Sequence, residues 1–178
     1  MKALHRAAFL DRDGVINRDV GYVHRIADFE LLPGVVGALQ RLAATGHALI
    51  VVTNQSGLAR GLFDNADYEA LTQYLHDILA RDGITLDGVY HCPHLPDATI
   101  ARYRCDCACR KPQPGLLLRA IGDCAIDPKT SLLVGDKASD IAAGRAAGVG
   151  KCYLVGSDAP GAADACYVDL AACIDAVI

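Results

Sequence analysis

Apolar runs of strand length alternate with helical patterns along this chain. The five runs are residues 7–10, 48–53, 88–91, 131–134 and 152–155. Strands that are buried on both faces have such continuous apolar sequences, and parallel sheets are built mainly from strands of this kind. The alternation therefore predicts an α/β fold with a doubly wound, Rossmann-like and mostly parallel sheet that is covered by helices.

The segments between these runs carry helical signals. Apolar residues recur at helical spacing over residues 35–42, and a second helix begins at Asp64 or Asn65, either of which suits an N-cap. Gly46 and Gly83 suit the C-terminal ends of these two helices, because glycine readily adopts the left-handed conformation found there. Three further helices are expected over residues 116–120, 141–147 and 170–177.

Two long stretches, residues 17–34 and 93–114, have no periodic pattern. Loops longer than ~12–15 residues are uncommon inside a compact domain and are usually functional. One of these stretches follows the first predicted strand and the other follows the third. Because ligands of an open parallel sheet bind outside the carboxyl ends of its strands, both stretches are expected beside a binding site.

Composition excludes several classes of function. The formal net charge of −4 provides no basic surface for nucleic acid, and no apolar run approaches the ~18 residues of a membrane span. Eight Cys in 178 residues are about 4.5%, below the ~8–10% of a disulfide scaffold, and residues 1–8 lack a secretory signal pattern. We expect a cytoplasmic monomer with reduced thiols, one domain over residues 1–178 and a small-molecule ligand.

Acidic and polar side chains follow three of the predicted strands. Asp11 and Asp13 come directly after the first strand, Thr53 and Asn54 end the second, and Asp136 follows the fourth. Paired carboxylates can bind a hard cation at a reacting centre, and a hydroxyl with exposed amides can bind phosphate. Each segment alone is compatible with an ordinary turn or helix cap, and for the two aspartates alone the turn is the simpler interpretation. Together, at one edge of the sheet, they indicate a phosphate site.

Two cations, Arg110 and Lys111, follow the second long stretch and could hold a phosphate group, although surface charge is the simpler interpretation of this pair alone. Asp140 stands four residues after Asp136, where it can cap the following helix.

In this order the motifs resemble those of the haloacid dehalogenase superfamily of phosphatases, which act through an aspartyl phosphate. The matching segments run from the first strand to beyond Asp140 and are Asp11-Arg12-Asp13-Gly14, Thr53-Asn54, Lys111-Pro112 and Gly135-Asp136 with Asp140. The resemblance implies that Asp11 attacks phosphorus. It also implies that Asp13 protonates the departing alcohol and then accepts a proton from water.

The resemblance further implies a catalytic Mg²⁺ held by Asp11, Asp136 and the main-chain carbonyl of Asp13. Thr53, Arg110 and Lys111 would hold the oxygens of the transferred phosphoryl group. Asp140 either binds the metal or orients the pocket, and the sequence leaves both roles open.

A second cluster of metal-binding residues occupies residues 92–109. Cys92 and His94 precede a group of three cysteines, Cys105, Cys107 and Cys109. Three thiolates and one imidazole suit tetrahedral Zn²⁺, although free thiols are the alternative. Spacing alone permits either Cys105 with Cys107 or Cys107 with Cys109 as the second pair.

A zinc-loop subgroup of the superfamily carries Cys-x-Cys directly before Arg-Lys-Pro, and this resemblance implies Cys107 and Cys109 as the second pair. A site with four protein ligands has no open position, so the zinc is expected to be structural and to order the segment that carries Arg110 and Lys111.

Neither long stretch is large enough for a cap domain, so substrate selectivity is expected from loops. The candidate substrate-binding residues are Asp19, Val20, Gly21, Tyr22, Asn54, Gln55, Ser56 and Lys137, with His24 either beside them or simply packed. Residues 21–24 and 53–61 resemble the heptose bisphosphate phosphatases, which implies removal of the 7-phosphate of D-glycero-D-manno-heptose 1,7-bisphosphate on the route to lipopolysaccharide. A histidinol-phosphate phosphatase of the same zinc-loop group and a non-catalytic phosphate-binding zinc module remain as alternatives.

Overall fold

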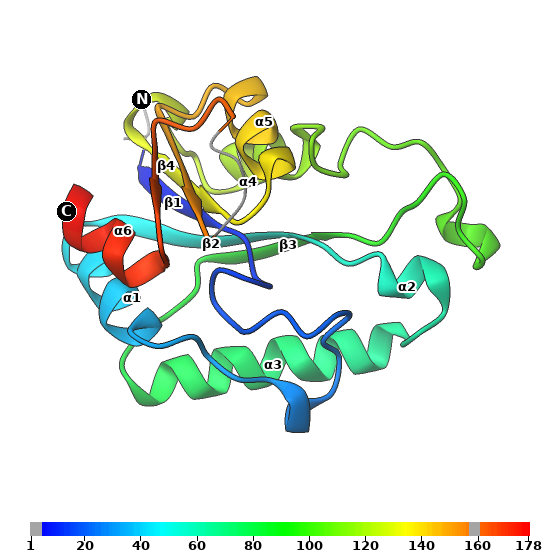
Figure 1. The fold of residues 1–178 in the computed structure, drawn as a ribbon. Coiled ribbons are helices and arrows are strands. Elements are labelled where there is room, and N and C mark those ends of the chain that lie inside the picture. The colour runs from blue at the N-terminus through cyan, green and yellow to red at the C-terminus, as the bar shows by residue number, and fades with distance from the viewer. Residues whose placement is uncertain (1–4, 157–160) are drawn as a thin grey trace.

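A six-stranded parallel sheet forms the centre of the molecule in the computed structural model, which describes residues 5–156 and 161–178 (Figure 1). Its strands are β1 (Arg6–Leu10), β2 (His47–Asn54), β3 (Gly88–Cys92), β4 (Leu132–Gly135), β5 (Lys151–Val155) and β6 (Ala165–Tyr167). They lie in the order β3-β2-β1-β4-β5-β6, and every neighbouring pair is parallel. This confirms the predicted doubly wound sheet. The strand order reverses between β1 and β4.

Both faces of the sheet are covered by helices, which explains the continuous apolar runs. The helices are α1 (Val35–Ala44), α2 (Gly57–Arg60), α3 (Asn65–Arg81), α4 (Gly115–Asp123), α5 (Ala138–Ala146) and α6 (Leu170–Val177). Along β1, Ala8 and Leu10 pack in the apolar cluster that includes α1, α3 and α6. Ala7 and Phe9 point to the opposite face, into the cluster that includes α4 and α5. All four side chains are fully buried, as strands between two helical layers require.

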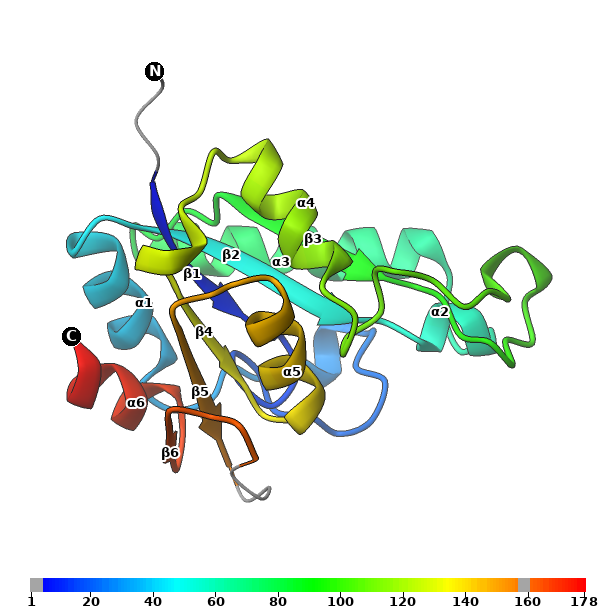
Figure 2. The same cartoon turned by 90° about the horizontal axis from the view of Figure 1, so that it is seen from above.

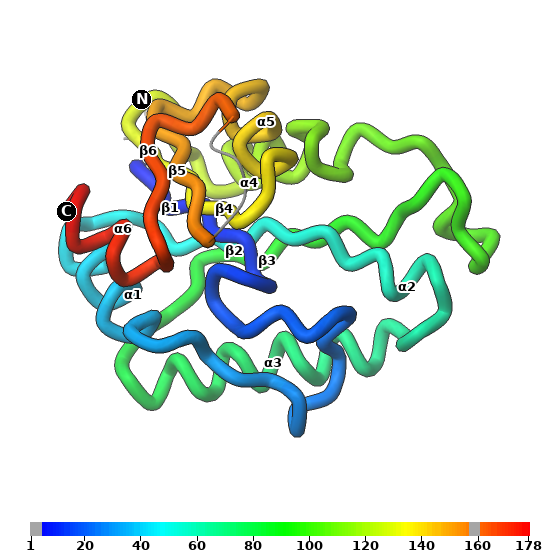
Figure 3. The backbone as a smooth tube through the Cα atoms, viewed as in Figure 1, coloured from blue at the N-terminus to red at the C-terminus, as the bar shows by residue number. Residues whose placement is uncertain are grey.

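Two observed elements lie outside the predicted set. Strand β6 has only three residues, which are partly or fully exposed, and it is identified by its pairing with β5 (Figure 3). Helix α2 is a single turn, too short to show a helical period. Helix α5 also begins before its predicted start at residue 141, because the polar residues of its first turn interrupt the apolar pattern.

The predicted start of the long helix α3 is confirmed by its capping box. The Asp64 carboxylate accepts the Asp67 main-chain N–H at 3.0 Å, and the Asp67 carboxylate accepts the Asp64 N–H at 3.1 Å. Asp64, and not Asn65, is therefore the N-cap.

The two long stretches lie at the carboxyl end of the sheet, and the one after β3 extends away from it (Figure 2). Each contains only one short 3-10 helix, Ile26–Asp28 and Ala101–Tyr103. The second stretch packs against α2 and the start of α3 through a separate apolar cluster that includes Leu58, Phe63 and Leu95. Among the helices of the described ranges, none has both the length and the apolar character needed to cross a membrane.

The buried imidazole of His47 predicts a pH dependence of stability. His47 is 8% exposed, and one of its ring nitrogens, Nδ1, lies 2.9 Å from Thr45 Oγ1. Burial, with a smaller contribution from Arg6, lowers the pKa of His47 below its ordinary value of 6.5. Below pH 6.5 the unfolded chain therefore takes up a proton that the folded chain excludes, so stability falls as the pH drops toward the lowered pKa.

We expect urea unfolding at pH 7.5 and about pH 5.5 to show that His47→Asn removes up to about 1 kcal/mol of this pH-dependent loss. Asparagine keeps a polar group near the position of Nδ1. His76→Asn on α3 is the matched control and should lose stability with pH as the wild type does. Equal losses in the wild type and His47→Asn would contradict the assignment.

Candidate active site

Most of the predicted catalytic and substrate-binding residues surround one cleft at the carboxyl end of the sheet. Its volume is about 550 Å³, and it lies where the strand order reverses, the position at which doubly wound sheets bind ligands. The sequence-predicted residues that line it are Asp11, Asp13, Asp19, Gly21, Tyr22, Thr53, Asn54, Gln55, Ser56, Arg110, Lys111, Lys137 and Asp140. Pro112 and Ser139 line it as well.

Asp11 is held at the end of β1 by an extension of the sheet. Its main-chain N–H donates to the Val134 carbonyl of β4 at 3.0 Å, so the first residue after the strand keeps the direction of the strand. The following turn brings Gly14, with a φ of +85°, against Asp136, where any Cβ atom would overlap the Asp136 carboxylate. The turn therefore needs glycine in order to bring the two acidic segments together.

Asp11 is a buried residue, with 7% of its surface exposed, and its carboxylate receives two donors. The Arg12 main-chain N–H lies 2.7 Å from Oδ1, and Lys111 Nζ lies 3.1 Å from the same oxygen. Among the described residues no hydrogen-bonding contact falls on Oδ2. Burial, with a contribution from the neighbouring carboxylate of Asp140, raises the pKa of Asp11, and Lys111 opposes this rise.

Lys111 uses all three of its ammonium hydrogens inside the protein. Its Nζ lies 2.6 Å from Asp140 Oδ1 and 3.1 Å from Asp11 Oδ1, and it donates to the Val52 carbonyl at 2.8 Å. Burial works to lower the pKa of Lys111, but the two carboxylates outweigh it and raise the pKa. The lysine therefore remains charged although it is only 3% exposed.

The segment that carries Lys111 is fastened to β2 by Asn54. The Asn54 side-chain amide donates to the Lys111 carbonyl at 3.1 Å and accepts the Lys111 N–H at 3.1 Å. The peptide bond between Lys111 and Pro112 is cis. Asn54, which the sequence suggested as a substrate contact, thus has a clear positioning contact.

Asp11, Asp136 and Asp140 offer carboxylate oxygens that lie within 4.8 Å of one another. One of them, Asp136 Oδ1, is buried and has no hydrogen-bond partner among the described residues. Burial and the nearby Asp11 charge raise the pKa of Asp136 to about 7. Crowded carboxylates with an unpaired buried oxygen are chemically suited to a hard divalent cation.

Asp140 differs from the other two carboxylates because its oxygens are already engaged. Oδ1 pairs with Lys111, and Oδ2 accepts the Lys137 main-chain N–H at 3.0 Å at the start of α5. Of the two roles that the sequence left open, these contacts favour orientation of Lys111.

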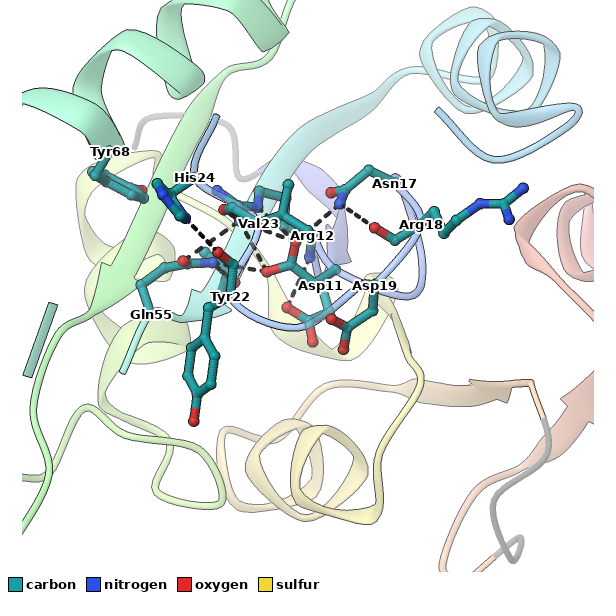
Figure 4. Close-up of polar contacts among 12 residues, drawn as sticks. Asp11, Arg12, Asn17, Arg18, Asp19, Tyr22, Val23, His24, Gln55 and Tyr68 are labelled. Carbon is teal, nitrogen blue, oxygen red and sulfur yellow. Dashed lines mark hydrogen bonds and ion pairs between the residues drawn. The ribbon is translucent and has the colours of Figure 1, made fainter. Parts of the chain in front are cut away.

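The Asp13 carboxylate is surrounded by donors from the side chains of Arg12, Asn17 and Gln55, which are labelled in Figure 4. Asn17 Nδ2 donates to Oδ1 and Gln55 Nε2 to Oδ2, each at 2.9 Å, and the Arg12 guanidinium contacts both oxygens. The same Gln55 nitrogen lies 2.9 Å from Thr53 Oγ1. Arg12 and Asn17 were not among the predicted site residues. Their only sequence signal is their place beside the Asp11-x-Asp13 motif.

Of the predicted substrate-binding residues after β1, some line the cleft and others do not. Asp19 and Gly21 lie at the cleft, where the Asp19 carboxylate accepts the Gly21 N–H at 2.9 Å and lies 3.5 Å from Lys137 Nζ. Tyr22 lies there too, in a left-handed conformation with a φ of +52° and with 45% of its surface exposed. Val20 is 57% exposed and is not among the described residues that line the cleft. His24 stacks on Phe63, with ring centroids 5.1 Å apart, which matches the packed alternative.

The four predicted zinc ligands lie together. Cys92 Sγ lies 3.1 Å from Cys109 Sγ and 3.5 Å from Cys107 Sγ, and His94 Nδ1 lies 3.3 Å from Cys109 Sγ. Ligands on a tetrahedron with Zn–S bonds of ~2.3 Å would be about 3.8 Å apart, so a small expansion admits the ion. Cys105 is exposed and lies outside this group.

A buried carboxylate beside a charged lysine, with further carboxylates for a divalent cation, is an arrangement suited to phosphoryl transfer through an enzyme carboxylate. Comparison with known proteins agrees with this site. Residues 108–172 match the HAD-hydrolase-like family. The chain is a phosphoric monoester hydrolase of the haloacid dehalogenase superfamily.

Two relatives from Photorhabdus laumondii identify the family within this superfamily. The chain is 49% identical to a D-glycero-beta-D-manno-heptose-1,7-bisphosphate 7-phosphatase over 86% of this chain and 82% of that one. It is 43% identical to a D-glycero-alpha-D-manno-heptose-1,7-bisphosphate 7-phosphatase over 87% of this chain and 85% of that one. The chain belongs to this family of heptose-1,7-bisphosphate 7-phosphatases.

A solved structure of a heptose bisphosphate phosphatase is also similar to this chain. The D,D-heptose 1,7-bisphosphate phosphatase from B. bronchiseptica, complexed with magnesium and phosphate, is 34% identical, with a TM-score of 0.83 and 97% of each chain covered. The predicted superfamily and fold are therefore confirmed.

Proposed function

We propose that this chain removes the 7-phosphate of D-glycero-D-manno-heptose 1,7-bisphosphate, a step toward the heptose of lipopolysaccharide. The observation that carries the proposal is the Asp11 carboxylate, which is buried at the switch point of the sheet. Lys111 and the Arg12 N–H hold its Oδ1, while Oδ2 is left without a partner among the described residues. The family relationship supports the choice of substrate.

Asp11 would attack phosphorus through Oδ2, forming an aspartyl phosphate as the bond between phosphorus and the sugar oxygen breaks. Asp13 would give its proton to that departing oxygen, and in the second step it would take a proton from the water that releases phosphate. Thr53 and Arg110 line the cleft beside Lys111, where they can hold the oxygens of the transferred group. Asp19, Gly21, Tyr22, Ser56 and Lys137 would contact the sugar.

The carboxylates of Asp11 and Asp136 and the carbonyl of Asp13 would hold a magnesium ion. The unpaired Asp136 Oδ1 and the crowding of like charges support this ligand set. When bound, the ion supplies positive charge that offsets the repulsion between a carboxylate and a phosphate. Lys111 supplies a fixed positive charge at the same carboxylate.

Cys92, His94, Cys107 and Cys109 would bind a structural zinc ion, since four protein ligands leave no open position. Arg110 follows the last ligand directly, and its Nη1 donates to the His94 carbonyl at 3.4 Å. The ion would thereby order the segment that carries Arg110 and Lys111 into the cleft. All eight cysteines lie within the described residues and none of them forms a disulfide, which suits the cytoplasmic location that we propose.

Phosphate release with Mg²⁺ present tests the substrate. We expect kcat/KM for the heptose bisphosphate to exceed that for histidinol phosphate by at least about 100-fold, because the cleft would recognise a polyhydroxylated sugar. Both anomers should be assayed, and phosphorus NMR of the product should show that the 1-phosphate is retained. Faster cleavage of histidinol phosphate would overturn the substrate, and no release from any of these phosphates would support the non-catalytic alternative.

A further inference from the structure

The Arg12 guanidinium is buried against the carboxylate that we assign to proton transfer. Arg12 is 2% exposed, although its side chain carries a permanent charge. Its Nε lies 3.2 Å from Asp13 Oδ1, and its Nη2 lies 3.0 Å from both Asp13 Oδ1 and Asp13 Oδ2. Asn17 and Gln55 each donate to one of the same oxygens. Both oxygens of the Asp13 carboxylate therefore receive donors from Arg12, and each receives one more from Asn17 or Gln55.

The same guanidinium also contacts the loop after β1 and the end of β2. Nη2 donates to the Val23 carbonyl at 2.9 Å and lies 3.4 Å from Gln55 Oε1 (Figure 4). Val23 is buried and immediately follows Tyr22, which lines the cleft. Arg12 therefore joins three parts of the site: the Asp13 carboxylate, the loop that reaches the cleft and the β2 end that carries Thr53.

The contacts are not those of a group placed for stability alone. Arg12 Nη1 is buried and has no hydrogen-bond partner among the described residues, although burying an unsatisfied donor is costly. An apolar residue between the two aspartates would avoid that cost but could not hold Asp13. A lysine could keep the charge, but its one nitrogen could not replace the planar fork of two nitrogens, Nε and Nη2, that Arg12 presents to Asp13.

We propose that Arg12 is a positioning residue that holds the Asp13 carboxylate in the orientation required for proton transfer and links it to the loop over the cleft. The inference rests on the proposed function, in which Asp13 gives a proton to the departing oxygen and later takes one from water. Without Arg12, the carboxylate can turn away from the departing oxygen. The attack of Asp11 on phosphorus does not depend on that orientation.

Leaving-group dependence tests this role. A sugar alkoxide needs a proton as it departs, whereas p-nitrophenolate departs as a stable anion. We expect Arg12→Gln to lower kcat/KM for the heptose bisphosphate about 100-fold and that for p-nitrophenyl phosphate less than about tenfold. Because Asp13 also serves the second step, p-nitrophenol should appear in a burst equal to the enzyme concentration. Arg12→Lys should resemble Arg12→Gln if the fork, and not the charge, is what matters.

Three further comparisons distinguish a failure of the role proposed for Arg12 from a failure of the proton transfer proposed for Asp13. Asp13→Asn should show the same leaving-group dependence, and adding Arg12→Gln to it should lower turnover little further. If Asp13→Asn affects both substrates equally, the proposed proton transfer is wrong. If Asp13→Asn behaves as expected but folded Arg12→Gln and Arg12→Lys affect both substrates equally, Arg12 is structural and the inference fails. Arg18→Gln changes an exposed arginine paired with Glu30, and should leave both rates unchanged.

Discussion

Replacing Asp11 with asparagine is expected to lower phosphate release at least about 10⁴-fold while leaving the fold intact. The amide has nearly the shape of the carboxylate but cannot attack phosphorus. The substitution removes one of three crowded carboxylates, and Lys111 keeps its contacts with Asp140 and the Val52 carbonyl. We therefore expect the thermal midpoint to shift by less than about 5 °C.

The measurement is kcat for phosphate release, together with thermal unfolding of the same preparations. Asp77→Asn on α3 removes a carboxylate that contacts only the Gln73 side chain among the described residues, and it should leave both quantities unchanged. Turnover above about a tenth of the wild-type rate in folded Asp11→Asn would mean that another group attacks phosphorus or that water does so directly.

Cys107→Ala should lower zinc content and phosphate release together. Cys107 Sγ lies 3.3 Å from Cys109 Sγ and 3.5 Å from Cys92 Sγ, so its loss opens one position of the proposed ligand set. Without a complete site, the segment that carries Arg110 and Lys111 would lose its order. We expect zinc content to fall from about one ion to less than half an ion per chain and turnover to fall at least about tenfold.

Cys105→Ala is the matched control, because Cys105 is an exposed cysteine only two residues away and lies outside the cluster. It should keep both zinc and turnover. Metal analysis by mass spectrometry beside the phosphate assay distinguishes the cases. Equal zinc loss from the two variants would show that the ligand set is wrong. Zinc loss without any loss of turnover would show that the ion does not order the segment that carries Arg110 and Lys111.

Local sequence was sufficient for most of the fold. The strands β1, β2, β4 and β5 were predictable because burial on both faces demands an uninterrupted apolar run, whereas β3 lies at the edge of the sheet and is only partly buried. The long helix α3 was predictable from its caps and periodicity. The missed elements, α2 and β6, have four and three residues. At such lengths a period does not repeat, so these elements exist through their packing and pairing with the rest of the chain.

The site was predictable in position but not in its contacts. Asp11, Thr53 and Asp136 could be expected together because the carboxyl ends of parallel strands share one edge of the sheet. The pairing of Lys111 with Asp140 could not be read from either residue, since it needs β4 beside β1 and the segment after β3 folded back over both. Asn17 could not be assigned to Asp13 because its role depends on where its amide points.

By itself, the sequence determined the parallel sheet, the edge at which the chemistry occurs and the identity of its acidic residues, because periodicity and strand ends are local properties. Only the tertiary structure decided which side chains pair. In the folded chain Lys111 is buried between two carboxylates, and one Asp136 oxygen has no hydrogen-bond partner among the described residues. The Arg12 guanidinium contacts both oxygens of Asp13. The physical reason is that a charged group is costly to bury without a partner, and burial is a property of the whole packed chain.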